Sequence, residues 1–292
     1  MSDSTDRRTF LATLGAAALT LAARPQPGRV EELSLQLGSR KLKKVGLQLY
    51  TVRDAMAKDV PGTLERVAQI GYKEVEFAGY FNHSPNEIRE MVAKYKLTAP
   101  SSHVPYPADH AAWEKTVDEA KIAGHQYVTI AWTPEEKRKG PDAYKHVADD
   151  FNKAGAVAKK AGLQFAYHNH DYELASTGEG ALPLDVLFES TDPALVTFEM
   201  DLYWMVHGGA DPLAYMKKYP GRVSMVHVKD AKADPEHTMT AVGQGSIDFP
   251  KIFAYDAAHG SHIKHAFVEH DQPADPFASI TTSYEYLAKM NY

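Results

Sequence analysis

Short runs of apolar and β-branched residues alternate with longer segments of helical periodicity from residue 45 to the C-terminus. This alternation is typical of repeated strand–helix units and a parallel sheet. Eight strands are predicted, at residues 45–50, 72–77, 98–102, 127–131, 164–168, 196–201, 223–228 and 265–269. Helical patterns occur between and after them, at residues 60–70, 85–95, 111–123, 144–161, 182–189, 212–219 and 277–290. Gly71, Gly124 and Gly162 are expected to cap helices shortly before the next strand begins.

Eight strand–helix pairs in about 250 residues match a closed (β/α)8 barrel in number and in length. A doubly wound open sheet is the alternative fold, but it normally carries a glycine-rich phosphate loop after its first strand. The segment in that place, residues 46–51, has no such loop. We therefore expect one TIM-barrel domain at residues 45–292.

The first 23 residues have the features of an export signal. Arg7 and Arg8 precede an apolar stretch at residues 10–23 that ends in small residues, which is typical of the twin-arginine route. This stretch of 14 residues is shorter than the roughly 20 apolar residues that span a bilayer. No stable membrane anchor is therefore expected. Residues 24–44, which contain Pro25, Pro27 and Gly28, are predicted to be a linker. We expect recognition by the twin-arginine export machinery and a periplasmic or secreted protein.

Composition excludes several classes of chemistry. The net charge of -6 arises from 38 acidic and 32 basic residues, without a basic block that could neutralise a run of phosphates, so nucleic acid is not an expected partner. The chain has no cysteine, which excludes disulfides, thiolate ligands and a thiol nucleophile. Any metal must therefore be held by histidine, aspartate or glutamate. The sequence does not indicate an oligomeric state.

Polar residues replace apolar ones where the predicted strands end, which is where the reactive side chains of a (β/α)8 barrel lie. The residues at these ends are Glu76, His103, His168 and His170, Glu199 and Asp201, His227 and Lys229, and Glu269 and Asp271. Alternate residues of a strand share a face, so both members of each pair should point the same way. The intervening Val226, Val228, Ala266 and Val268 suit packing against the helices. The polar set is therefore expected to face the barrel mouth.

Carboxylates and imidazoles crowded into one mouth would repel each other or lose their charge unless a cation joined them. One divalent metal ion resolves this conflict, with His168, Asp201, His227 and Glu269 as its predicted ligands. Nitrogen and oxygen donors without sulfur fit Mn²⁺, Mg²⁺, Co²⁺ and Zn²⁺ alike. His170 is the alternative ligand on the fifth strand, and Glu199 is either an acceptor that orients a ligand or an ion-pair partner.

Six segments carry a resemblance to a known family by their order and spacing: residues 46–53, 167–171, 201–204, 226–230, 243–249 and 268–271. From residue 45 onward the chain resembles the xylose isomerase-like TIM-barrel superfamily. Within it, the chain is most similar to the group called sugar phosphate isomerases/epimerases. That group also contains inosose dehydratases, ketose 3-epimerases and metal-dependent AP endonucleases.

The resemblance implies a metal held by Glu, Asp, His and Glu from strands five to eight. Asp201, His227 and Glu269 match the last three. On strand five this chain has His168, followed by Asn169 and His170, where many members carry Glu followed by Asn-His. In the ketose 3-epimerases the two glutamates also act as opposed acid and base. The histidine is therefore compatible with metal binding but argues against epimerisation by two carboxylates.

The activity that the resemblance implies is that of a metal-dependent sugar isomerase or epimerase, which removes a proton next to a carbonyl. Glu269 is the predicted ligand and base, and His168, His170 or Lys229 is the opposing acid. Export favours an unphosphorylated sugar, because phosphorylated sugars are largely intracellular. One alternative is a lyase that cleaves a 3-keto-glycoside, or dehydrates a keto-sugar, by β-elimination. The other is a periplasmic sugar-binding protein without catalytic activity.

Seven residues are predicted to contact the sugar: Gln48, Glu76, His103, His170, Glu173, Trp204 and Asp271. Aromatic side chains near the mouth could also stack on apolar sugar faces. They are Tyr50, Tyr80, Phe81, Trp132, Tyr172 and Trp204. Ordinary packing at the rim is an equally simple interpretation for all of them except Trp204, which lies beside Asp201 in the sequence.

Overall fold

The computed structural model describes residues 38–139, 142–176 and 180–292. The predicted export signal, residues 1–23, and residues 24–37 of the predicted linker lie outside the described residues. Both stay predictions. None of the helices in the described ranges combines the length and apolarity that a membrane crossing requires.

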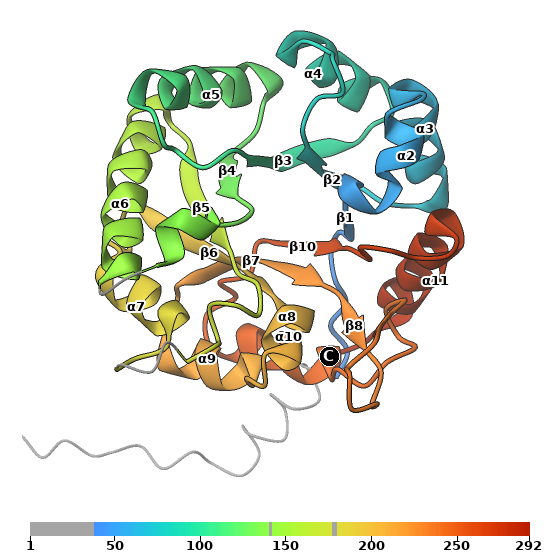
Figure 1. The fold of residues 1–292 in the computed structure, drawn as a ribbon. Coiled ribbons are helices and arrows are strands. Elements are labelled where there is room, and N and C mark those ends of the chain that lie inside the picture. Colours follow the sequence, from blue (N-terminus) through green and yellow to red (C-terminus); the bar gives the residue numbers. More distant parts are fainter. Residues whose placement is uncertain (1–37, 140–141, 177–179) are drawn as a thin grey trace, which may run out of the picture. The chain divides into compact units, whose positions relative to one another are not determined.

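Eight parallel strands close into a barrel in the described part of the chain, in the order β1-β10-β7-β6-β5-β4-β3-β2. Their bounds are β1 Gly46–Gln48, β2 Glu74–Ala78, β3 Thr98–Val104, β4 Tyr127–Ile130, β5 Gln164–His168, β6 Val196–Asp201, β7 Val223–Val228 and β10 His265–Val268. Helices surround this ring of strands (Figure 1). The prediction of a single (β/α)8 barrel is confirmed.

The helices of the described residues are α2 Arg53–Met56, α3 Val60–Ile70, α4 Pro85–Lys94, α5 His110–Ala123, α6 Ala143–Ala161, α7 Pro183–Ser190, α8 Leu202–His207, α9 Pro212–Lys218, α10 Phe249–Ala258 and α11 Pro276–Lys289. Two 3-10 turns, η1 Leu49–Val52 and η2 Glu135–Arg138, and an antiparallel pair, β8 Asp230–Ala231 with β9 Met239–Thr240, complete the elements. Asp109 accepts a hydrogen bond from the first turn of α5, and Asp275 does so for α11. Gly124 and Gly162 end α5 and α6 in the left-handed conformation, at φ 91° and 87°, as predicted.

The first strand is shorter than predicted. It ends at Gln48, whose side-chain oxygen accepts a hydrogen bond from the Tyr50 N–H at 3.1 Å and so begins the turn η1. Local side-chain bonding of this kind competes with continuation of the strand. Gln48 is therefore the last residue of β1, and its side chain lies beside Glu76 of β2.

The strand side chains separate into two apolar clusters. Val226, Val228, Ala266 and Val268 belong to the main core with the helices, which confirms their predicted direction. A second cluster contains Ala166, Met225 and Phe267, on the alternate face of the strands and therefore inside the barrel. Gly46 gives room to the Phe267 ring, since a Cβ at position 46 would lie 2.5 Å from Phe267 Cδ1. The barrel interior is thus filled directly beneath His168, His227 and Glu269, each two residues further along its strand.

Candidate metal centre and active site

Three side chains from adjacent strand ends form what we call the upper triad: Asp201, His227 and Glu269. One ligand atom from each lies within 4.8 Å of the others. None of the three residues is more than 5% exposed. Their imidazole nitrogen and carboxylate oxygens are donors that divalent metal ions accept. The upper triad therefore fits a metal site, and it contains the three residues that the sequence predicts from strands six, seven and eight.

The carboxylate of Asp201 is fixed by the local fold. Asp201 ends β6 and begins α8, where its Oδ1 accepts the Trp204 N–H at 2.9 Å. Its own backbone N–H donates to Asn169 Oδ1 at 3.0 Å. Its buried Oδ2 makes no hydrogen bond of good geometry within the described residues, although Lys229 Nζ lies 3.1 Å away, and burial raises the pKa of Asp201 to about 6. The Lys229 ammonium is thus a cation that offsets the cost of burying this oxygen, and a metal ion would share the oxygen with it.

Lys229 places an ammonium group against the upper triad. Its Nζ lies 3.1 Å from Asp201 Oδ2, 2.8 Å from Glu269 Oε2 and 2.8 Å from Asp271 Oδ1. Burial by itself would lower the pKa of Lys229, but the carboxylates of Asp201, Glu269 and Asp271 hold it well above its usual value. Burial would likewise raise the pKa of Glu269, but Lys229 and His227 hold it well below the usual value. The pair is therefore an ammonium beside an ionised carboxylate.

The imidazole of His227 separates two sets of carboxylates. Its Nδ1 lies 2.7 Å from Glu269 Oε2, whereas its Nε2 lies 2.7 Å from Glu76 Oε2 and 3.1 Å from Glu199 Oε2. Gln48 Nε2 donates to the same Glu76 oxygen at 2.7 Å. Burial would lower the pKa of His227, but Glu199 and Glu269 raise it well above its usual value. His227 therefore has an acceptor at both of its nitrogens.

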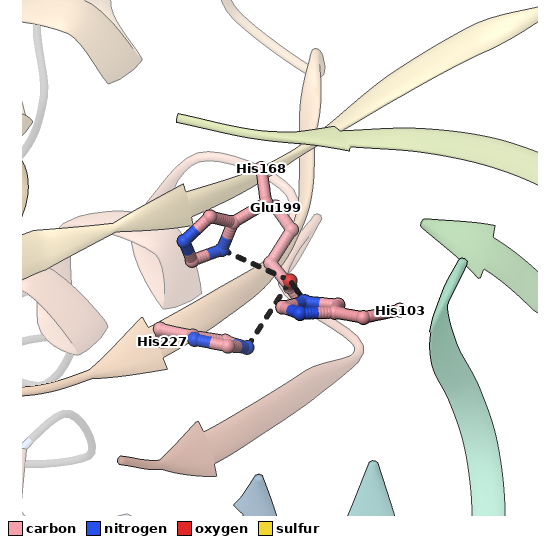
Figure 2. Close-up of side chains that lie close together, drawn as sticks. All are labelled: His103, His168, Glu199 and His227. Carbon is pink, nitrogen blue, oxygen red and sulfur yellow. Dashed lines mark hydrogen bonds and ion pairs between the residues drawn. The ribbon is translucent and has the colours of Figure 1, made fainter. Parts of the chain in front are cut away.

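Beneath the upper triad lies a second group, which we call the lower cluster: His103, His168, Glu199 and His227. Figure 2 shows the three imidazoles directed at one oxygen of Glu199. Their nitrogens lie 2.8, 3.2 and 3.1 Å from Glu199 Oε2, for His103 Nε2, His168 Nδ1 and His227 Nε2 respectively. Burial would raise the pKa of Glu199, but His227 and His103 hold it well below the usual value.

His168, the predicted fourth ligand, lies between these two groups. Its Nδ1 faces Glu199, and its Nε2 is 3.6 Å from Asp201 Oδ2. Burial lowers the pKa of His168 to about 3, so the ring is neutral near pH 7 and one nitrogen has a free electron pair. His170, the alternative on the same strand end, has its ring 4.9 Å from that of His168 and stacks on Tyr172. The structure thus brings His168 nearer than His170 to the carboxylates.

A cavity of about 770 Å³ opens over these groups. This volume lies in the usual range for small-molecule sites. Its polar wall consists of His103, His168, His170, Lys229, Glu269, Asp271 and Gln272. Tyr50, Trp132 and Trp204 also line it, and Tyr50 and Trp132 are 43% and 51% exposed. Three of the six candidate aromatic residues therefore do reach the cavity.

The structure divides the seven predicted substrate contacts. His103, His170, Trp204 and Asp271 line the cavity. Gln48, Glu76 and Glu173 have no exposed surface and are not part of its lining, and their contact with a sugar stays a prediction. Gln48 and Glu76 hold His227, as described above. Glu173 accepts hydrogen bonds from the Tyr167 hydroxyl and from the His170 N–H, the latter at 2.8 Å. In this structure all three residues contact other side chains or backbone groups of the site.

Asp230 organises the loop beside Lys229, a role that the sequence did not reveal. Its carboxylate accepts the N–H groups of Gly243 and Gly245, both at 2.9 Å, and that of Ile247 at 3.2 Å. A Cβ on Gly245 would lie 2.3 Å from Asp230 Oδ1. The two glycines, spaced by one residue, were the available signal for a backbone wrapped closely around an acceptor.

Known proteins are similar to this chain in sequence and in fold. The family model described as xylose isomerase-like TIM barrel matches residues 64–260. An inosose dehydratase of Geobacillus kaustophilus is 25% identical over 243 residues, which cover 67% of this chain and 78% of that protein. An inosose dehydratase of Clostridium perfringens is 33% identical over 128 residues, 38% of this chain and 42% of the relative. A solved structure from Parabacteroides distasonis, described as a sugar phosphate isomerase/epimerase, is 30% identical with a TM-score of 0.75 and covers 85% of this chain and 98% of its own.

Proposed function

The chain belongs to the xylose isomerase-like TIM barrel family, and on that premise we propose that it is a divalent-metal-dependent enzyme acting on a carbonyl-bearing sugar or cyclic polyol. The upper triad of Asp201, His227 and Glu269, beside a cavity of about 770 Å³, carries this proposal. A divalent ion held by these residues, with His168 as the predicted fourth ligand, would polarise the substrate carbonyl and stabilise negative charge on its oxygen. Mn²⁺, Mg²⁺, Co²⁺ and Zn²⁺ all suit the donors of the upper triad.

The proposed reaction is a β-elimination. Glu269 accepts the proton from the carbon next to the carbonyl, and the electron pair of that C–H bond is delocalised onto the carbonyl oxygen. The pair then forms the carbon–carbon double bond as the C–O bond at the β carbon breaks. Lys229 gives a proton to the departing oxygen, which leaves as water or as an alcohol. General acid and base catalysis of this kind contributes about 10²–10⁴-fold to a rate.

Three observations support elimination. The Lys229 ammonium and the Glu269 carboxylate both line the cavity and lie 2.8 Å apart, so a proton donor and a proton acceptor face the same substrate. His168 stands on β5 where epimerisation by two carboxylates would need an acid. The two relatives described above are named as dehydratases, which remove water.

Isomerisation or epimerisation is the second candidate. It is favoured by the relative from Parabacteroides distasonis, which bears that description and is 30% identical. In this reaction Glu269 removes the same proton, and His168 or another cavity residue returns a proton to the same carbon or to its neighbour. No bond to oxygen breaks, so the products of the two candidates differ.

Product analysis in D₂O tests the proposal. Metal-loaded protein is incubated with unphosphorylated sugars, keto-cyclitols and 3-keto-glycosides, beside the Glu269→Gln variant. Glu285→Gln, whose side chain is 62% exposed on α11, is the matched control. An unsaturated product or a released alcohol supports the lyase, whereas deuterium at a stereocentre without bond loss supports the isomerase. If the protein binds a sugar but forms no product, and Glu269→Gln binds it equally well, the protein is a sugar-binding protein without catalytic activity.

Export through the twin-arginine route is a separate proposal, supported by Arg7 and Arg8 before the apolar stretch at residues 10–23. The full-length chain is expected in the periplasmic fraction or the medium. An Arg7→Lys/Arg8→Lys double variant should remain in the cytoplasm. Equal distribution of both proteins between fractions would refute this route.

A further inference from the structure

The two oxygens of the buried Glu199 carboxylate have different surroundings. Three imidazole nitrogens lie 2.8–3.2 Å from Oε2, while Oε1 of the same carboxylate has no hydrogen-bond partner in the described part of the chain. A carboxylate offers about two electron pairs on each oxygen. His103 and His168 hydrogen bond to Oε2, whereas His227 Nε2, 3.1 Å away, hydrogen bonds to Glu76 Oε2 at 2.7 Å. Within the described residues the buried Oε1 atoms of Glu199 and Glu76 have no hydrogen-bond partner, and a nearby cation would offset the cost of burying them.

The same geometry matches a metal coordination shell. The nearest nitrogens of His103, His168 and His227 and the Glu199 oxygen all lie within 4.8 Å of one another. A tetrahedral Zn²⁺ ion with ligands at about 2.0–2.2 Å holds those ligands about 3.4 Å apart. The three distances from Glu199 Oε2, 2.8, 3.2 and 3.1 Å, are hydrogen-bond lengths and are shorter than this edge, so a bound ion would move the ligands slightly apart.

We propose that the lower cluster binds a transition-metal ion of its own, distinct from the ion of the upper triad. Its ligands are His103 Nε2, His168 Nδ1, His227 Nε2 and Glu199 Oε2. Three imidazoles and one carboxylate select Zn²⁺ or Co²⁺ over Mg²⁺ and Ca²⁺, which prefer oxygen. His227, and His168 as the predicted fourth ligand of the upper triad, face both sites through opposite ring nitrogens, so both ions bind at once only if these rings bridge them as imidazolates.

The surroundings of the lower cluster suit a bound ion. Glu76 Oε2 lies 2.7 Å from His227 Nε2 and 3.3 Å from His103 Nε2, so a fifth donor is at hand, and Gln48 orients it. Outer hydrogen bonds of this kind fix the ligands of metal sites. His103 lines the cavity and its side chain is 12% exposed, which gives an ion a path from solvent. His227 faces the upper triad through Nδ1, so it is common to both sites.

Zinc stoichiometry in paired variants tests the proposal. His103→Gln and Glu199→Gln change only the lower cluster, whereas Asp201→Asn and Glu269→Gln change only the upper triad. His110→Gln, on the surface of α5 with a side chain 73% exposed, is the matched control. Zinc per chain is measured by elemental analysis after dialysis, and Co²⁺ substitution reports tetrahedral coordination by its intense visible absorption. Circular dichroism verifies the fold of each variant. If the buried Glu199→Gln variant does not fold, the result for His103→Gln decides the test.

We expect His103→Gln and Glu199→Gln to lose one ion together with the tetrahedral Co²⁺ absorption. Asp201→Asn should lose the other ion and keep that absorption, and the control should keep both ions. Metal retained by His103→Gln and Glu199→Gln but lost from Asp201→Asn overturns the lower site and leaves the proposed function intact. Metal lost only from the lower-cluster variants supports the lower site and removes the metal from the proposed reaction. A wild-type protein that binds neither Zn²⁺ nor Co²⁺ overturns the lower site.

Discussion

The Lys229 ammonium lies 2.8 Å from Glu269 Oε2, and the two residues follow the neighbouring strands β7 and β10. Lys229 also contacts Asp201, so it touches both carboxylates of the upper triad. A positive charge at that distance repels a divalent ion bound by the same oxygens. Lys229 therefore stabilises the two acids and at the same time weakens their hold on a metal.

Replacing Lys229 should separate these two effects. For Lys229→Met we expect metal affinity at the upper triad to rise at least about tenfold, because a nearby like charge is removed. Turnover should fall by about 10²–10⁴-fold, because the proton donor is lost. Calorimetry and steady-state kinetics measure the two quantities. Lys229→Arg keeps the charge and should show no gain in affinity; a Lys229→Met protein that binds metal more weakly would contradict the role assigned to the ammonium.

Asn169 acts on the metal site through Asp201, whose backbone N–H it binds at 3.0 Å. Loss of such an outer hydrogen bond lowers metal affinity by about 10–100-fold. Asn169→Ala should therefore weaken metal binding and restore full turnover at saturating metal. The exposed Asn86 of α4 provides the control variant Asn86→Ala. Turnover that stays low in Asn169→Ala at saturating metal would show a direct catalytic role instead.

Glu173 should make stability depend on pH. Burial raises the pKa of Glu173 from 4.5 to about 7, so the folded state favours the protonated acid. Stability from this group is complete below the unfolded pKa and is lost as the pH rises through the folded pKa. A glutamine at position 173 does not titrate. The difference in unfolding free energy between Glu173→Gln and the wild type should therefore change in favour of the variant by up to about 3 kcal/mol as the pH rises from about 4.5 to about 8. Urea unfolding across this range measures it. The curve of unfolding free energy against pH for Glu285→Gln should run parallel to that of the wild type. A Glu173→Gln curve that also runs parallel to the wild type would refute the raised pKa of Glu173.

Gly46 and Phe267 should be coupled in stability. A methyl group on residue 46 meets the Phe267 ring at 2.5 Å and the Ala266 carbonyl oxygen at 3.0 Å. Overpacking of this kind costs about 1–3 kcal/mol, so Gly46→Ala should lower the unfolding free energy by that amount. Adding Phe267→Leu removes part of the ring and should recover some of the loss. Thermal or urea unfolding of the four proteins in this cycle gives the coupling energy. Strictly additive effects would show that the ring does not fill this space.

The barrel and the upper triad were predictable because both follow from local sequence. Alternation along each strand decides which residues face inward, and the strand ends of a parallel barrel meet at one rim. Asp201 is in register with His227, and Glu269 lies two residues beyond Phe267, the partner of His227, on the same inward face, so alternation and strand order suffice to predict their approach. The short helix α8 was missed because its six residues, Leu202–His207, are too few to show a helical period.

All four residues of the lower cluster were predicted to face the barrel mouth, but their convergence on one carboxylate was not predictable from the same pattern. His103 lies on β3 and reaches Glu199 on β6, with β4 and β5 between them in the barrel. Such a contact depends on side-chain length and on the direction of each ring nitrogen, neither of which is encoded by spacing along one strand. The burial of Glu173 had a similar origin, because Tyr167 from the end of β5 folds over its carboxylate.

The cluster of Ala166, Met225 and Phe267 closes the barrel beneath the polar residues. The reaction chamber is therefore a blind-ended well, and whatever enters at the rim beside Tyr50 and Trp132 must return the same way. An elimination produces two fragments from one substrate. If the proposed elimination releases an alcohol, a single exit requires the two products to leave in sequence, and each should inhibit a different form of the enzyme.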